Sequence, residues 1–134
     1  AFQPQIILMQ CGADSHFDDR LANLRLTTNC YEQMIEIVHT LAHKICEGRI
    51  LLFGGGGYSL SSVARCWTLA FAKLAEMQLP DDMPENWCKL FEKMSGEKAP
   101  NALRDLEGKV GIELTAYVEK LLKELREIIP MLRG

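Results

Sequence analysis

The stretch ILLFGGGGYSLSSVARCW, Ile50–Trp67, places four consecutive glycines and a tyrosine between an apolar run and a helical pattern. The apolar run, residues 49–53, is typical of a buried strand in a parallel sheet. Beyond the glycines, Ser59 or Ser61 can cap a helix that continues to about Met77. A strand, a glycine-rich turn and a helix in this order indicate an α/β arrangement.

The preceding residues predict a matching strand and helix. QIILMQC, Gln5–Cys11, is a second apolar run, and we expect a strand that is covered on both faces. From residue 28 or 29 to Glu47, apolar residues recur at spacings of three and four, which predicts an amphipathic helix. Asn29 and Glu32 suit a capping box at its start. The order strand, helix, strand, helix therefore predicts a right-handed βαβα unit with parallel strands.

The pattern changes after Leu79. Two prolines in residues 78–87 indicate a connection, and a short helix is expected to end near Met94. A stripe of apolar residues from about Ile112 to Ile129 predicts a last helix that packs on the sheet. We therefore expect a parallel-sheet part over residues 1–79 and a helical extension packing on it over residues 80–134.

Composition limits the possible partners. The chain has 134 residues, 48% of them hydrophobic and 25% charged, as expected of one soluble globular domain. The net charge of -3 and the absence of a basic run argue against nucleic acid or an anionic membrane as a partner. The five cysteines form no C-x-x-C pair, which favours free thiols in a reducing compartment, so we expect a cytoplasmic protein. Since Ala1 is not a methionine, we interpret the chain as a fragment of a longer protein.

The βαβ unit predicts where a site would form. Loops that follow two parallel strands leave the sheet at the same edge, so Asp14 and the segment Gly54–Tyr58 should open into one crevice. Glycines let the backbone approach a ligand closely, and the phenol of Tyr58 can donate a hydrogen bond. Neither the dinucleotide fingerprint nor the P-loop pattern fits these glycines. A phosphate at the start of the following helix, or a purely structural turn, stays open.

Two ordered motifs resemble a known family. QCGADSHFDDRL, Gln10–Leu21, followed by LFGGGGYSLSSVARCW, Leu52–Trp67, resembles the closing third of the catalytic domain in the zinc-dependent histone deacetylase superfamily. The bacterial acetoin utilization deacetylase branch is the most similar, and the resemblance extends from Phe2 to about Leu79. It implies part of a parallel-sheet, arginase-like deacetylase fold and a zinc-dependent amidohydrolase that acts on acetyl-lysine.

The resemblance also implies roles by position. Asp14 matches a zinc ligand, and Tyr58 matches the catalytic tyrosine that polarises the acyl carbonyl together with the metal. Gly55, Gly56 and Gly57 would line the channel for the acyl-lysine stem. The family's other two zinc ligands and its histidine pair belong to an upstream part of the same domain. We therefore expect this chain alone to be inactive and, because its sheet has an unpaired edge, to self-associate.

The remaining polar residues have competing interpretations. Asp14 and His16 have D-x-H spacing, but the resemblance places only the aspartate on the metal and His16 at the rim or behind the ligands. Asp19 is interpreted as a hydrogen-bond acceptor that orders its loop, and Arg65 as a buried ion-pair partner. Whether the substrate is an acetylated protein, an acetylpolyamine or another acylamine stays open.

Two histidines lie on the predicted helix that ends at Glu47. His39 and His43 are spaced one helical turn apart, but Thr40 replaces the glutamate that a zincin motif requires. We interpret these histidines as part of a solvated helix face.

The alternative to a deacetylase is a non-catalytic, doubly wound binding or scaffold module whose glycine loop holds an anion.

Overall fold

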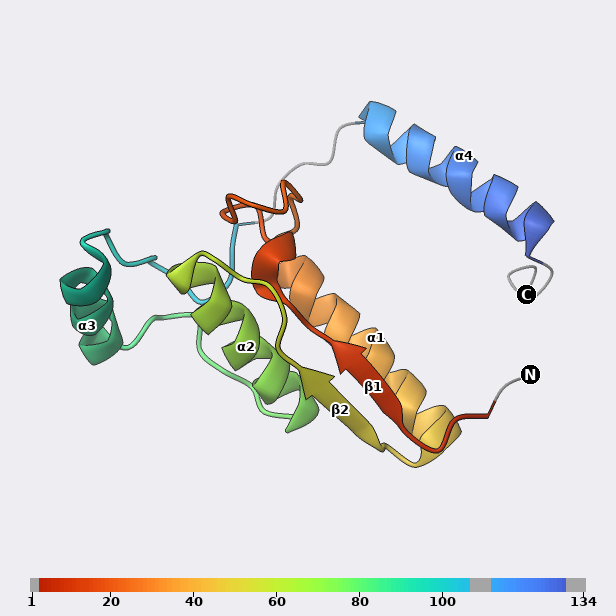
Figure 1. Ribbon diagram of the computed structural model, residues 1–134, viewed down its shortest axis with the longest axis horizontal. Coiled ribbons are helices and arrows are strands. Elements are labelled where there is room, and N and C mark those ends of the chain that lie inside the picture. The colour runs from red at the N-terminus through yellow and green to blue at the C-terminus, as the bar shows by residue number, and fades with distance from the viewer. Residues whose placement is uncertain (1–2, 107–111, 130–134) are drawn as a thin grey trace.

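The computed structural model describes residues 3–106 and 112–129 and has the predicted α/β order (Figure 1). Its elements, in chain order, are β1 (Ile7–Gln10), the 3-10 turn η1 (Ala13–Ser15), α1 (Thr28–Cys46), β2 (Ile50–Phe53), α2 (Leu60–Leu74), α3 (Glu85–Ser95) and α4 (Ile112–Ile128). None of the described helices is long and apolar enough to cross a membrane.

The two strands are parallel neighbours, as the βαβ pattern predicts. Ile7 lies opposite Ile50 and Gln10 lies opposite Phe53. The crossover between them is α1, which runs back along the strands (Figure 1). Both strands therefore end at the same edge of the sheet, where the two motifs begin.

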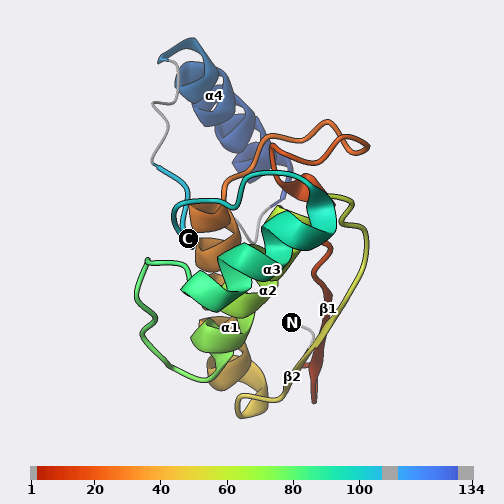
Figure 2. The same ribbon diagram turned by 90° about the vertical axis from the view of Figure 1, so that its left-hand side faces the viewer.

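Only one face of this sheet is covered by the described residues. Figure 2 shows α1 and α2 on the same side of the strands. On the opposite face Leu8, Leu51 and Phe53 are exposed, at 61%, 48% and 44%. The expectation that the strands are covered on both faces is wrong for this structure. An apolar strand indicates that two covering layers are needed, but it does not indicate that the same chain segment supplies both.

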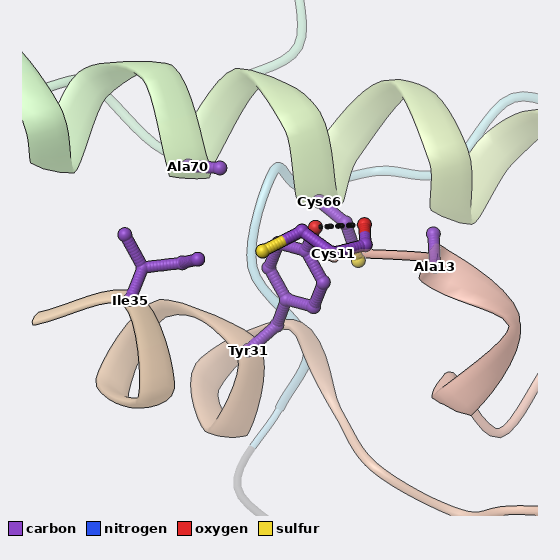
Figure 3. Packing of buried hydrophobic residues seen from close by; sticks show 6 residues of the cluster. All are labelled: Cys11, Ala13, Tyr31, Ile35, Cys66 and Ala70. Carbon is purple, nitrogen blue, oxygen red and sulfur yellow. Dashed lines mark hydrogen bonds between the residues drawn. The ribbon is translucent and has the colours of Figure 1, made fainter. Parts of the chain in front are cut away.

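The core lies between the helices and the inner face of the sheet. Tyr31 and Ile35 of α1 pack with Cys66 of α2 around Cys11, which follows β1 (Figure 3). The hydroxyl of Tyr31 donates a hydrogen bond to the backbone oxygen of Cys11 at 2.7 Å. Burial raises the pKa of Tyr31 well above its ordinary value, and the neighbouring thiols add to the shift. The phenol therefore stays neutral and fixes α1 to the end of β1.

The starts of α1 and α2 are set by side-chain caps. Thr27 precedes α1, and its Oγ1 accepts a hydrogen bond from the backbone N–H of Cys30 at 3.3 Å. The predicted cap at Asn29 is wrong, because Thr27 already satisfies the first turn two residues earlier. Ser59 caps α2 through the N–H of Ser62, which confirms one of the two predicted caps.

The residues after α2 return to the first helix. The N–H of Leu103 donates to the backbone oxygen of Asp81 at 2.7 Å, which joins the chain before α3 to the chain after it. Arg104 then donates to Glu32 of α1 at 2.9 Å. The predicted division after residue 79 stays a prediction.

The last helix differs from the expectation. Residues 112–128 are helical, as the apolar stripe predicts, but the described side chains over 115–129 are exposed. Within the described parts of the chain α4 does not pack on the sheet (Figure 1). An amphipathic stripe indicates that a helix can bury one face, and it does not specify the surface that covers that face.

Candidate functional site

The two motifs meet at the carboxyl edge of the sheet. The N–H of Cys11 donates to the backbone oxygen of Phe53 at 2.8 Å, and the N–H of Ala13 donates to the backbone oxygen of Gly56 at 2.7 Å. The ladder of the sheet is thereby continued from the strands into the two loops. The prediction that both loops lie at one edge is confirmed.

The Asp14 carboxylate lies against two glycines. A Cβ added at Gly12 would lie 2.6 Å from Asp14 Oδ1, and a Cβ added at Gly56 would overlap Asp14 Oδ2. Asp14 itself is partly buried, in η1. A side chain at either glycine would therefore displace the carboxylate from the place where the two loops touch.

Two further glycines allow the second loop to approach the first. A Cβ at Gly55 would overlap the side-chain amide of Gln10 and lie 3.2 Å from the Cα of Gly12. Gly57 has a φ of 150° and a Cβ there would lie 2.6 Å from Val63 Cγ2. Gly55 therefore permits contact between the two loops, and Gly57 permits the chain to pass close to α2, whether or not they also line a substrate channel. The channel stays a prediction.

Asp19 connects the first loop to Tyr58. Its Oδ2 accepts the backbone N–H of Tyr58 at 2.8 Å, and its Oδ1 accepts the N–H of Leu21 at 2.9 Å. These hydrogen bonds hold the pKa of Asp19 below its ordinary value. The interpretation of Asp19 as a loop-ordering acceptor is confirmed. The side chain of Tyr58 is 65% exposed, so its backbone is fixed while its phenol is accessible.

Tyr58 lines a cavity between the start of α2 and α3. The cavity has a volume of about 780 Å³, and its lining includes Arg20, Ser61, Phe91 and Lys98. Asp14 is not among the residues that line it. The backbone hydrogen bonds thus bring the two predicted site residues to one edge, but the described residues do not enclose both in one pocket.

His16 has no free nitrogen for a metal. Its Nε2 lies 2.8 Å from Asp105 Oδ2, and its Nδ1 accepts the backbone N–H of Asp18 at 3.1 Å. This pattern fits the neutral ring with the proton on Nε2. Of the three zinc ligands expected from the family resemblance, Asp14 is the one present among the described residues at this edge. A catalytic zinc needs three protein ligands, so Asp14 fits as one of them and cannot hold the ion by itself.

The sequence interpretation missed Asp105, which joins three segments. Its Oδ1 accepts from Arg65 Nη1 at 2.6 Å, and its Oδ2 accepts from the N–H of Thr28 at 2.8 Å. Its own N–H donates to Thr28 Oγ1 at 2.7 Å. Burial would raise the pKa of Asp105, but the hydrogen bonds from His16, Thr28 and Arg65 outweigh it and hold the pKa well below the ordinary range. The predicted ion-pair role of Arg65 is confirmed, and a buried arginine was the only signal that a carboxylate must exist elsewhere.

The two histidines on α1 differ in exposure. His39 is only 9% exposed, and its Nε2 lies 3.0 Å from the Nε2 of His43. The interpretation of both histidines as part of a solvated face is therefore wrong for His39, beside which the end of α2 packs, and it is correct for His43, which is exposed.

Comparisons with known proteins agree with the motifs. The family model for the histone deacetylase domain matches residues 1–74. Acetoin utilization protein AcuC from Bacillus subtilis is 33% identical over 105 residues, which is 78% of this chain and 27% of that protein. Human histone deacetylase 1 is 38% identical over 85 residues, 63% of this chain and 17% of that protein.

A solved structure gives the same result for the fold. The crystal structure of an HDAC homolog from Aquifex aeolicus aligns with a TM-score of 0.64 and 27% identity, covering 90% of this chain and 34% of that chain. The present chain therefore spans only 17% to 34% of the length of these relatives.

Proposed function

Because the chain belongs to the histone deacetylase family and shares its arginase-like fold, we propose that it forms part of the active site of a zinc-dependent lysine deacetylase. The proposal depends on one observation, the hydrogen bond from Ala13 N–H to Gly56 oxygen, which joins the loop of Asp14 to the loop of Tyr58. An upstream part of the same domain would supply the remaining zinc ligands and the histidine pair.

Asp14 and Tyr58 have different roles in this proposal. Asp14 contributes one carboxylate ligand, and a bound zinc would activate water and polarise the amide carbonyl. The phenol of Tyr58 donates a hydrogen bond to the acyl oxygen as negative charge develops on it. The accessible side chain supports this role, as does the hydrogen bond that the backbone N–H of Tyr58 donates to Asp19.

The isolated chain is expected to be inactive. Asp14 is one ligand where three are needed, and both nitrogens of His16 are already engaged. The test is to incubate the 134-residue chain with zinc and an acetyl-lysine peptide and to measure acetate release. Release above that of heat-denatured chain would contradict the proposal.

In the complete enzyme, the Tyr58→Phe variant separates catalysis from metal binding. We expect zinc content to stay unchanged while deacetylation of an acetyl-lysine peptide falls by about 100-fold or more, since one donor to an oxyanion is removed. Tyr117→Phe, which removes a phenol from α4, is the matched control and should leave turnover unchanged. Normal turnover in Tyr58→Phe would refute the role of the phenol.

The Asp14→Ala variant tests the metal ligand in the same enzyme. Zinc content measured by metal analysis should fall, whereas Asp18→Ala, a change to an exposed carboxylate in the same loop, should retain it. Full zinc content in Asp14→Ala would exclude Asp14 as a ligand.

An anion-binding scaffold is less well supported. The N–H groups of Tyr58 and Ser62 already donate to Asp19 and Ser59, so they are not available to an anion. The carboxylates of Asp14 and Asp19 beside the loop would also repel a negative charge.

The proposal extends to substrate, location and assembly. Parallel assays with an acetylated peptide and an acetylpolyamine would distinguish the two substrate classes.

We also propose a cytoplasmic location, because all five cysteines are free thiols and free thiols are typical of a reducing compartment. We also propose that the isolated chain self-associates through the uncovered sheet, which light scattering would test; a clean monomer would count against it.

A further inference from the structure

The end of α1 and the end of α2 bring two imidazoles and a carboxylate together, away from the glycine loop. His39 and His43 project from the same face of α1 because they are four residues apart. Glu76 follows α2, and one ligand atom from each of the three residues lies within 4.8 Å of the other two. The sequence interpretation considered the histidines without Glu76.

The spacing of the ring nitrogens fits a shared cation. Two nitrogens on a tetrahedral zinc ion, each at about 2.0–2.1 Å from the metal, lie about 3.3 Å apart. The Nε2 atoms of His39 and His43 are 3.0 Å apart, so small rotations of the rings would reach that spacing. Two imidazoles and one carboxylate are a known zinc donor set that leaves a fourth position for water. We propose that His39, His43 and Glu76 form a second metal site, for zinc or another divalent transition metal that favours imidazole.

Packing restricts the two histidines before a metal arrives, and a turn of the backbone places Glu76. His39 is almost buried. The ring of His43 rests on Gly48, where an added Cβ would lie 2.8 Å from the Cε1 atom. Glu76 has a left-handed backbone with a φ of 54°, which turns the chain at the end of α2.

The charges around the site are compatible with a cation. The cluster lines a cavity of about 430 Å³ together with Glu36 and Lys73. Lys73 is the one described lysine or arginine in that lining, and its Nζ lies 3.1 Å from Glu36 and 3.9 Å from Glu32. Its charge is therefore compensated by carboxylates other than Glu76.

A metal at this position would clamp the two helices together. His39 and His43 belong to α1, and Glu76 follows α2, so the ion would cross-link elements that are otherwise joined by packing. Any ligand that binds only the folded state raises its stability. This site is independent of the proposed deacetylase chemistry and needs no upstream residues.

The experiment uses the full 134-residue chain without a histidine tag. Calorimetric titration with zinc should show that one ion binds per chain. The absorption spectrum with Co²⁺ in place of zinc should show the visible bands of a four- or five-coordinate ion and no charge-transfer band from a thiolate ligand. His43→Ala and Glu76→Gln, both at exposed side chains, should each lower the affinity by at least about tenfold. Zinc should raise the Tm of the unaltered chain by several degrees and that of His43→Ala much less.

Two controls make the assignment specific. Glu85→Gln removes an exposed carboxylate of α3 that does not line this cavity, and Asp14→Ala removes the carboxylate at the carboxyl edge of the sheet; both variants should bind zinc as the unaltered chain does. Loss of binding in Asp14→Ala, a thiolate band with cobalt, or unchanged affinity in His43→Ala would each overturn the proposal. Circular dichroism of each variant without metal would verify that its helices are intact.

Discussion

Replacing Asp105 with asparagine should strongly destabilise the chain, because one carboxylate joins three distant segments. The substitution keeps the size of the side chain and removes its charge. Arg65 is only 4% exposed and would lose its 2.6 Å partner, while its Nε already lacks a hydrogen-bond partner in the described structure. The hydrogen bonds from His16 and from the N–H of Thr28 would also weaken.

The expected cost can be worked out from these contacts. Removing one partner of a buried ion pair costs about 3–5 kcal/mol, because the other charge stays buried without compensation. The side chain of Asp105 is 11% exposed, so solvent screens this interaction little. Asp18 Oδ2 lies 3.8 Å from Arg65 Nη2 and still compensates part of the charge. We therefore expect the free energy of unfolding to fall by about 3 kcal/mol, the lower end of that range and a large part of the roughly 5–15 kcal/mol that holds a typical domain together.

Urea unfolding at neutral pH, followed by circular dichroism, measures this change. Glu97→Gln is the control, since Glu97 lies 3.6 Å from Arg20 and both side chains are exposed, so its loss should cost less than about 1 kcal/mol. Asp105→Asn combined with Arg65→Met should be more stable than Asp105→Asn alone, because no unpaired charge remains. A loss in Asp105→Asn no larger than that of the control would refute the reasoning.

The same carboxylate predicts the direction of a pH effect. The pKa of Asp105 in the folded chain is lower than its ordinary value of 3.8. Its contribution to stability is therefore complete above that ordinary value and is lost as the pH falls toward the folded pKa. Between pH 5 and pH 2 the unaltered chain should lose more stability than Asp105→Asn does. Parallel urea curves at several pH values would test this, and equal losses in both proteins would contradict it.

Three further predictions concern the contact between Gly56 and Asp14, a buried thiol and a helix cap. Gly56→Ala should cost about 1–3 kcal/mol in urea unfolding, because its Cβ would overlap the carboxylate of Asp14; no loss would show that the loop yields freely. Burial raises the pKa of the Cys66 thiol to about 12, so Cys66 should resist a thiol reagent at pH 8 while exposed Cys30 reacts, and equal labelling would contradict the packing. Thr27→Ala should cost about 1 kcal/mol by removing the cap of α1, and an unchanged urea midpoint would argue against that cap.

Local patterns predicted the fold because each of its elements has a local signal. The apolar runs at Ile7–Gln10 and Ile50–Phe53 indicated strands, and the glycines after the second strand indicated a tight turn before a helix. The parallel pairing followed from the single helical crossover. The sequence alone thus indicated the edge of the sheet from which Asp14 and Tyr58 emerge.

The parts that were missed depend on contacts between distant residues. Asp105 lies 89 residues from His16 and 77 from Thr28, and no periodicity connects them. Glu76 reaches His43 only because α2 packs beside α1 and ends in a left-handed turn. The exposure of α4 was missed for the opposite reason. Its apolar stripe is a local signal, and we assumed that the sheet of the same chain covers it.

The position of Asp105 also imposes an order of events during protein synthesis. The segment that matches the family ends at residue 74, yet the salt bridge that secures the start of α1 to α2 requires a residue translated later. At about 5–20 residues per second, a ribosome needs roughly 2–6 s more to add the intervening stretch. During that interval the guanidinium of Arg65 has no carboxylate from Asp105. The junction between the start of α1 and α2 therefore cannot reach its final stability until the chain after α3 has emerged.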